Sequence, residues 1–157
     1  MIRLKTTFLL FVLLFLVSFT PSIQKASINK SLSNEGFNEL QQELDANKGH
    51  LVLINFWASY HANSRIENIK FANLMKNNNG FVVISVSLDA YQSVFEETVK
   101  RDGLSCVQNI HATNGFDSKL ANKYKLGNDF GNLLLDAKGK VLAKNLTPDE
   151  LKAYLQN

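Results

Sequence analysis

The chain has 157 residues, of which 45% are hydrophobic and 20% are charged, the balance of a globular domain and not of a disordered chain. The pI of about 9.0 would suit a nucleic-acid-binding protein, but Arg3, Lys5 and Lys25 all precede Ser27. The rest of the chain carries 14 basic and 14 acidic residues, so its charge gives no basis for predicting a nucleic-acid partner.

The N-terminus has the pattern of a secretory signal. Arg3 and Lys5 are followed by an unbroken apolar run over residues 8–17, which is too short to span a hydrocarbon core of about 30 Å. We therefore predict an exported protein, periplasmic or secreted, or one anchored in the membrane by residues 8–19 if the segment is not cleaved. The predicted organisation is a signal peptide over residues 1–26, a linker over residues 27–33 and one domain over residues 34–157.

Helical and strand patterns alternate along that domain. The spacing of apolar residues predicts helices over residues 34–48, 61–77, 91–101 and 117–124, and a last helix that opens at Thr147. Apolar runs predict strands over residues 51–58, 81–89 and 106–110, and a hairpin over residues 133–143. Within the helices, Ile66 and Val94 fall at core-facing spacing. The order predicts an α/β fold with a central mixed sheet and helices on both faces.

The stretch from Leu51 to Arg65 joins a buried strand to the start of a helix. Backbone N–H groups are unpaired at a helix start, so such a place can stabilise an anion. Residues 55–65 have the sequence N-F-W-A-S-Y-H-A-N-S-R. This resembles N-F-W-A-x-W-C-x-x-C-R, the signature of TlpA/ResA-type periplasmic proteins of the thioredoxin-like superfamily, which includes the AhpC-type proteins. Similar segments follow in the same order over residues 86–89, 100–104, 124–126 and 134–146.

The resemblance covers roughly residues 34–157 and implies a thioredoxin fold and thiol–disulfide exchange. His61 and Ser64, however, stand at the positions of the attacking and resolving cysteines, and neither side chain can form a disulfide. Phe130 stands at the position of the family's cis-proline, so we expect a trans peptide bond and a reshaped loop there. These departures predict a degenerate active site.

Two other interpretations of His61 and Ser64 remain open. The residues are three apart on a predicted helix, so they could form a base and a nucleophile, although no third residue is placed to orient His61. Ser64 and Glu67 also have the spacing of a capping box, which would make His61 and Ser64 exposed residues of the helix start.

Cys106 is the only cysteine of the chain, so an intramolecular disulfide cannot form. In an apolar run it is predicted to be a small buried hydrophobe, or else a lone thiol that forms a mixed or intermolecular disulfide. The spacing of His50, His61 and His111 matches no metal motif. We predict neither a metal nor a cofactor.

Two functions are compatible with these residues. The first is an exported binding or structural module that recognises another envelope protein or a peptide, touches the membrane only through an uncleaved N-terminal segment and does not turn over dithiols. The alternative is a thiol–disulfide oxidoreductase of the TlpA/ResA class with altered chemistry through Cys106.

Overall fold

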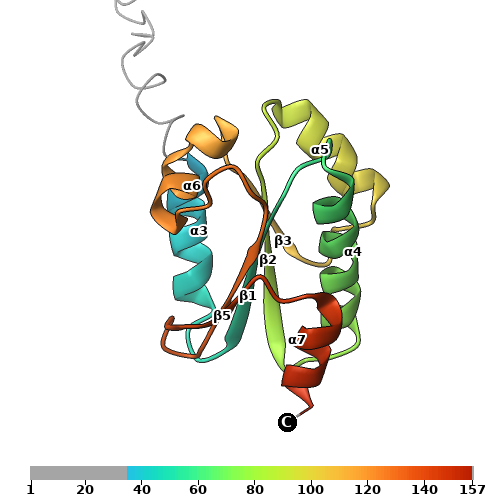
Figure 1. Cartoon of the computed structure of the whole chain (residues 1–157), viewed down its shortest axis with the longest axis vertical. Helices are drawn as coiled ribbons and strands as arrows, with labels where there is room; N and C mark the ends of the chain where they lie inside the picture. Colours follow the sequence, from blue (N-terminus) through green and yellow to red (C-terminus); the bar gives the residue numbers. More distant parts are fainter. Residues whose placement is uncertain (1–34, 157) are drawn as a thin grey trace, which may run out of the picture.

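The computed structural model describes residues 35–156, so the predicted signal peptide and linker lie outside the described residues. The elements are, in chain order, α3 (Glu35–Ala46), β1 (Leu51–Trp57), α4 (Ala62–Lys76), β2 (Phe81–Ser87), α5 (Gln92–Arg101), β3 (Gln108–His111), the 3-10 helix η2 (Gly115–Asp117), α6 (Lys119–Tyr124), β4 (Asn132–Leu135), β5 (Val141–Lys144) and α7 (Pro148–Leu155). The strands form one mixed sheet with helices on both faces, as predicted (Figure 1).

The sheet has the strand order β3-β2-β1-β4-β5. β1 pairs in parallel with β2, and β2 pairs in parallel with β3, whereas β4 runs antiparallel to both β1 and β5. β1 and β2 are nearly continuous apolar runs because helices cover both of their faces. The carboxyl ends of the three parallel strands therefore lie at the same end of the sheet, where the chain turns from Trp57 toward His61.

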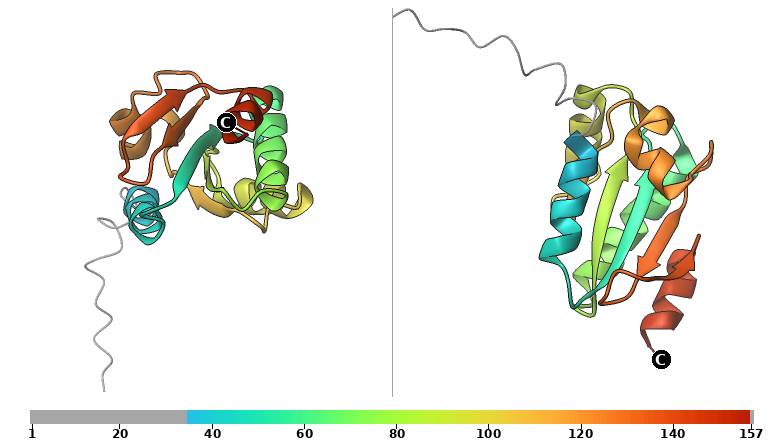
Figure 2. Two further views of the ribbon diagram at one scale, coloured as in Figure 1. Left: turned by 90° about the horizontal axis from the view of Figure 1, so that it is seen from below. Right: turned by 90° about the vertical axis from the view of Figure 1, so that its left-hand side faces the viewer.

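Two apolar clusters hold the layers together. α3 and α6 cover one face of the sheet, and α4, α5 and α7 cover the other (Figure 2). Leu40 of α3 packs on the first face and Phe71 of α4 on the second, and both are fully buried. No helix between residues 35 and 156 combines the length and apolarity that a bilayer crossing requires.

The last part of the chain forms the hairpin and the helix that its sequence predicts. Thr147 caps α7 in a complete capping box, in which Glu150 accepts a hydrogen bond from the Thr147 N–H at 2.8 Å. The predicted hairpin forms from β4 and β5, and the Gly139 N–H donates to the Asp136 carbonyl at 2.9 Å in the turn between them. Gly139 has φ +81°, a conformation that glycine adopts without steric cost.

Three local predictions are wrong. The third strand begins at Gln108 and not at Cys106, because the Asn109 side-chain amide donates to the carbonyls of Leu104 and Val107 and holds that segment as a turn. Val94 of α5 is 40% exposed and Ile66 of α4 is 51% exposed. In α4 the buried stripe consists of Ser64, Asn68, Phe71 and Ala72, so polar residues take core positions and Ile66 falls outside the stripe.

Candidate functional site

His61 begins α4 as its N-cap residue. Its backbone is extended, with φ −105° and ψ 99°, and its Nδ1 accepts a hydrogen bond from the Ser64 backbone N–H at 3.2 Å. The imidazole thus satisfies one of the N–H groups that a helix start leaves unpaired. The predicted capping box of Ser64 and Glu67 is wrong, because the helix starts three residues earlier than that box requires.

Ser64 is buried, with 3% of its surface exposed, so the prediction of an exposed Ser64 is also wrong. Its hydroxyl donates to the His61 carbonyl at 3.1 Å and accepts from the Ala58 N–H at 3.3 Å. These bonds tie the end of β1 to the first turn of α4. The His61 ring faces the backbone N–H of Ser64 and not its hydroxyl, so the two side chains do not form the nucleophile–base pair.

Phe130 lies in the loop between α6 and β4, next to the end of β1, where the Phe56 N–H donates to the Gly131 carbonyl at 2.9 Å. Its ring stacks on the His61 ring at 4.6 Å between centroids. Tyr60 meets the same ring edge-on at 6.1 Å, and Phe116 meets it at 5.1 Å. The structure thus brings together three positions that the sequence singled out, His61, Ser64 and Phe130.

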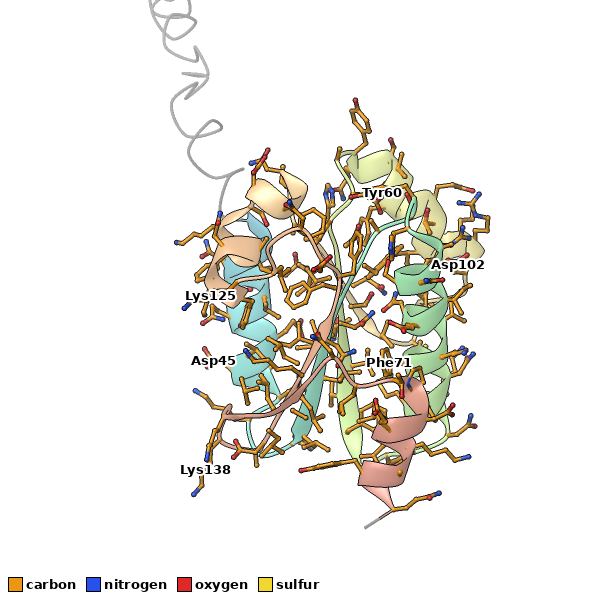
Figure 3. All side chains as sticks on the ribbon, viewed as in Figure 1. Asp45, Tyr60, Phe71, Asp102, Lys125 and Lys138 are labelled. Atoms are coloured by element: carbon orange, nitrogen blue, oxygen red, sulfur yellow. The ribbon has the colours of Figure 1, made fainter. Side chains whose placement is uncertain are left out.

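We call Tyr60, His61, Phe116 and Phe130 the aromatic cluster. Tyr60 is 68% exposed and lies at the upper end of the molecule, opposite Lys138 (Figure 3). Phe116 belongs to η2 and was not foreseen as part of the site. Residues 35–156 contain no cis peptide bond, so the chain passes Phe130 in the trans form.

Asp89 is a second residue of this region that the sequence did not reveal. It is 2% exposed, and its carboxylate accepts hydrogen bonds from the Ser59 N–H at 3.0 Å, the Ser59 hydroxyl at 2.7 Å and the Ser87 hydroxyl at 2.8 Å. The turn after β1 is therefore fixed to the end of β2. The only signal in the sequence was the polar pair Ser87 and Asp89 at the end of an apolar run.

An ion pair holds the first turn of α4 from the side. Arg65 Nε donates to Asp102 Oδ2 at 2.6 Å, and Arg65 Nη2 donates to Asp102 Oδ1. The hydrogen bond to Asp102 raises the pKa of the Arg65 guanidinium above its ordinary value, against the opposing effect of burial. The Asp102 side chain is only 5% exposed, so it depends on Arg65 for its charge partner.

Beneath α4 lies a chain of buried polar groups, which we call the polar network. Asn55 Nδ2 donates to Asn68 Oδ1 at 2.9 Å, Asn68 Nδ2 donates to Ser85 Oγ at 2.9 Å, and Trp57 Nε1 donates to the same oxygen at 2.8 Å. None of the four residues is more than 2% exposed. The network fixes α4 against β1 and β2 through hydrogen bonds between buried groups.

Cys106 lies apart from these residues. It is partly buried against the apolar cluster under α4 and α5, in the turn before the amino end of β3, whereas the aromatic cluster lies at the carboxyl ends of the strands. Within residues 35–156 no group of three or more His, Cys, Asp or Glu side chains is placed to hold a metal ion.

Solved structures identify the superfamily of the chain. A thioredoxin-like protein from Parabacteroides distasonis is 37% identical, with 69% of this chain and 82% of that chain covered and a TM-score of 0.65. The chain belongs to the thioredoxin-like, TlpA-type superfamily. The C-terminal domain of a protein classed as a thiol-disulfide oxidoreductase, from Bacteroides thetaiotaomicron, is 31% identical over 72% of this chain and 79% of that one, also with a TM-score of 0.65.

A thiol-disulfide oxidoreductase from Bacteroides fragilis has the same fold as this thioredoxin-like protein, at 27% identity over 69% of this chain and 81% of that chain, with a TM-score of 0.59. No protein-family model and no curated protein matches the chain. The similarity therefore confirms the predicted superfamily and the thioredoxin fold.

Proposed function

We propose that this thioredoxin-like protein is an exported binding module that does not turn over dithiols. The observation that carries the proposal is the stacking of His61 on Phe130 at 4.6 Å, while the same imidazole accepts the Ser64 N–H. The two positions that would attack a disulfide and support its substrate are packed against each other. Their side chains stabilise the helix start and the facing loop.

Chemistry supports the absence of turnover. Disulfide exchange requires a thiolate that attacks and a thiol that leaves, and an imidazole and a hydroxyl can do neither. Ser64 is also buried, with its hydroxyl engaged by His61 and Ala58.

The exposure of Tyr60 supports a binding role for the aromatic cluster. Tyr60 is 68% exposed while its ring meets Phe130 edge-on, so a partner could cover a large aromatic surface that Phe130 already supports. We infer that the partner is another envelope protein or a peptide. Export is supported by the basic start and apolar run of residues 1–26, which would act as a signal peptide or, uncleaved, as an anchor.

The alternative, an oxidoreductase that works through Cys106, has weaker support. Cys106 is partly buried against an apolar cluster near the amino end of β3, whereas the aromatic cluster lies at the carboxyl ends of the strands. A lone thiol also lacks the second cysteine that resolves a mixed disulfide.

Reduction of insulin by dithiothreitol tests the absence of turnover. We expect the purified protein and its Cys106→Ser variant to match the rate of the reagent alone. Activity above that rate which disappears in Cys106→Ser would overturn the proposal in favour of the alternative. A rate that stays above the reagent in Cys106→Ser would also overturn it. The His61→Cys, Ser64→Cys double variant serves as the matched control, because it carries both thiols on the same scaffold.

A further inference from the structure

Strand β5 is an open edge of the sheet. It is the last strand on its side, next to β4, and no other strand of residues 35–156 pairs with it. All of its side chains are exposed except that of Ala143, which is partly buried. This edge is therefore available for pairing with an additional strand.

The backbone of β5 presents hydrogen-bonding groups at this edge. Ala143 pairs with β4, and the Asn145 N–H donates to the Asn132 carbonyl of β4 at 2.9 Å. Because the peptide groups of successive residues in a strand point alternately to its two sides, those of Leu142 and Lys144 point away from β4. These are the backbone groups that a partner strand would bind.

Apolar side chains lie beside these groups. Val141 pairs with Leu135 of β4, which pairs with Val52 of β1, so the three side chains form a row from the buried core to the edge. Val141 is 40% exposed, and Leu142 beside it is 42% exposed. A hollow of about 300 Å³ lies next to this row, between α3, α6 and the hairpin. An apolar side chain of a partner strand could enter that hollow.

Lysines flank the same edge. Lys138, Lys140 and Lys144 are all exposed, and none of them forms an ion pair with an acidic side chain of residues 35–156. Asp136, the acidic residue of this hairpin, accepts hydrogen bonds from the backbone N–H groups of Lys138 and Lys140 at 2.8 and 2.9 Å. Its carboxylate is thus engaged in the turn. The edge carries an excess of positive charge that is complementary to an acidic segment.

The lysines also disfavour pairing with a second copy of this chain. If two β5 strands paired antiparallel about a two-fold axis at Leu142, Lys140 of one copy would lie opposite Lys144 of the other, and like charges in that position repel. The pairing of β4 with β5 also shifts register between Leu134 and Leu135. Lysines and irregular pairing are two means by which sheet edges avoid self-association. The charge pattern therefore favours a different chain that supplies negative charge.

We propose that β5 binds an extended segment of an acidic partner protein, in which carboxylate side chains flank apolar ones. The segment would pair with the backbone of Leu142 and Lys144, cover the Val141 side chain and place its carboxylates beside Lys140 and Lys144. In this mode of recognition, main-chain hydrogen bonds provide affinity and the side chains determine which segment is accepted.

This surface is separate from the aromatic cluster. Lys138 of the hairpin lies at the opposite end of the molecule from Tyr60 (Figure 3). Binding at β5 therefore does not depend on the role proposed for the aromatic cluster, and the two can be tested independently.

An NMR titration of the full chain in dodecyl maltoside micelles with a synthetic peptide tests the proposal. The probe is a peptide with blocked ends and the sequence Thr-Glu-Val-Thr-Val-Glu-Thr, and its control has lysine in place of both glutamates. We expect the glutamate peptide to cause saturable shifts of the amide signals of Leu142 and Lys144. The lysine peptide should bind at least about tenfold more weakly.

Charge reversal on the protein should reverse this preference. The Lys140→Glu, Lys144→Glu double variant should bind the lysine peptide and lose at least about tenfold in affinity for the glutamate peptide. Lys76→Glu with Lys100→Glu makes the same change of charge at exposed positions of α4 and α5 and should leave both affinities unchanged. Methylation of the alternate peptide nitrogens that face β5 should abolish binding, whereas methylation of the other set should not.

The absence of shifts at Leu142 and Lys144 up to the solubility limit of the glutamate peptide would overturn the proposal. Equal affinity for the two peptides would also overturn it, because charge would then not be recognised. Equal effects of the two methylation patterns would exclude strand pairing and overturn it as well. Shifts of the same amides that increase with protein concentration, without peptide, would assign the edge to a second copy of the chain and would overturn it too.

Discussion

Helix α4 meets two very different environments. Beneath it, the polar network of Asn55, Trp57, Asn68 and Ser85 is buried and joined by hydrogen bonds of 2.8–2.9 Å. At its start, the aromatic cluster is partly exposed and consists of ring contacts around Phe130. The first environment positions the helix, and the second occupies the place where the superfamily carries its chemistry. Different residues therefore position α4 and surround its start, so the residues at the start can change while the helix stays in place.

Replacement of Asn68 should have the largest effect on stability if the polar network positions α4. Asn68→Ala deletes two buried hydrogen bonds, which leaves the Asn55 amide without its partner and Ser85 with only the bond from Trp57. We expect a loss of about 2–4 kcal/mol in the free energy of unfolding, measured by urea denaturation. Asn73→Ala, on the exposed side of the same helix, is the control and should stay within about 0.5 kcal/mol of the parent. A loss below about 1 kcal/mol for Asn68→Ala would show that the network does not position α4.

Loss of the Arg65–Asp102 ion pair should lower the free energy of unfolding by a smaller amount, because Arg65 is partly exposed. Arg65→Met leaves the Asp102 carboxylate without its charged partner, but the Arg65 side chain is 30% exposed and solvent screens the interaction. We expect a loss of about 1–2 kcal/mol in the same denaturation experiment. The neighbouring exposed Arg101→Met variant should change stability by less than about 0.5 kcal/mol. Equal effects of the two substitutions would mean that Arg65 is an ordinary surface charge.

His61 should contribute to stability as a cap and not as a catalytic group. His61→Ala removes the acceptor for the Ser64 N–H and should cost about 1 kcal/mol. His61→Asn keeps a side-chain acceptor at the N-cap position and should recover most of that loss. If His61→Asn is as unstable as His61→Ala, the main contribution of His61 to stability would be its stacking on Phe130. The hydrogen bond of the cap would then contribute less.

The smallest expected effect is a pH dependence that arises at Asp136 and Glu150, which belong neither to the polar network nor to the aromatic cluster. Backbone hydrogen bonds from the N–H groups of Lys140 and Lys138 hold the pKa of Asp136 below its ordinary value, and bonds from Thr147 do the same for the pKa of Glu150. A lowered folded-state pKa favours the ionised folded form, so this contribution is complete above about pH 4.5 and is lost as the pH falls through the lowered value.

Thermal unfolding between about pH 3 and pH 6 measures this pH dependence. The slope of stability against pH should become shallower in the Asp136→Asn, Glu150→Gln double variant. Glu97→Gln, which removes one exposed charge from α5, is the control. An unchanged slope in the double variant would place the acid sensitivity in other carboxylates, including those near α4.

The sequence predicted the fold because its strands and most of its helices have strong periodic patterns. β1 and β2 are apolar runs, and Thr147 with Glu150 marks the start of α7. α4 was harder to predict, because Ser64 and Asn68 take buried positions that periodicity assigns to apolar residues. Only their partners across the fold, such as Ala58 and Asn55, make those positions favourable, and a single sequence does not reveal such pairs.

Residues of the candidate site were predictable only where the chain aligns with the family signature or with the family's cis-proline position. That alignment identified His61, Ser64 and Phe130, which the structure places together. Phe116 and Asp89 could not be found in this way, because their contacts depend on how η2 and the loop after β2 fold over the strand ends.

Site-specific photocrosslinking in the native host tests most directly whether the aromatic cluster is a binding surface. A benzoylphenylalanine at Tyr60 would sit on the exposed ring of the cluster, and one at Tyr154 of α7, which is 43% exposed at the other end of the molecule, is the matched control. We predict a discrete adduct from the Tyr60 position that is absent from the Tyr154 position and weakened by Phe130→Ala. No adduct at Tyr60, or equal adducts at both positions, would contradict the account.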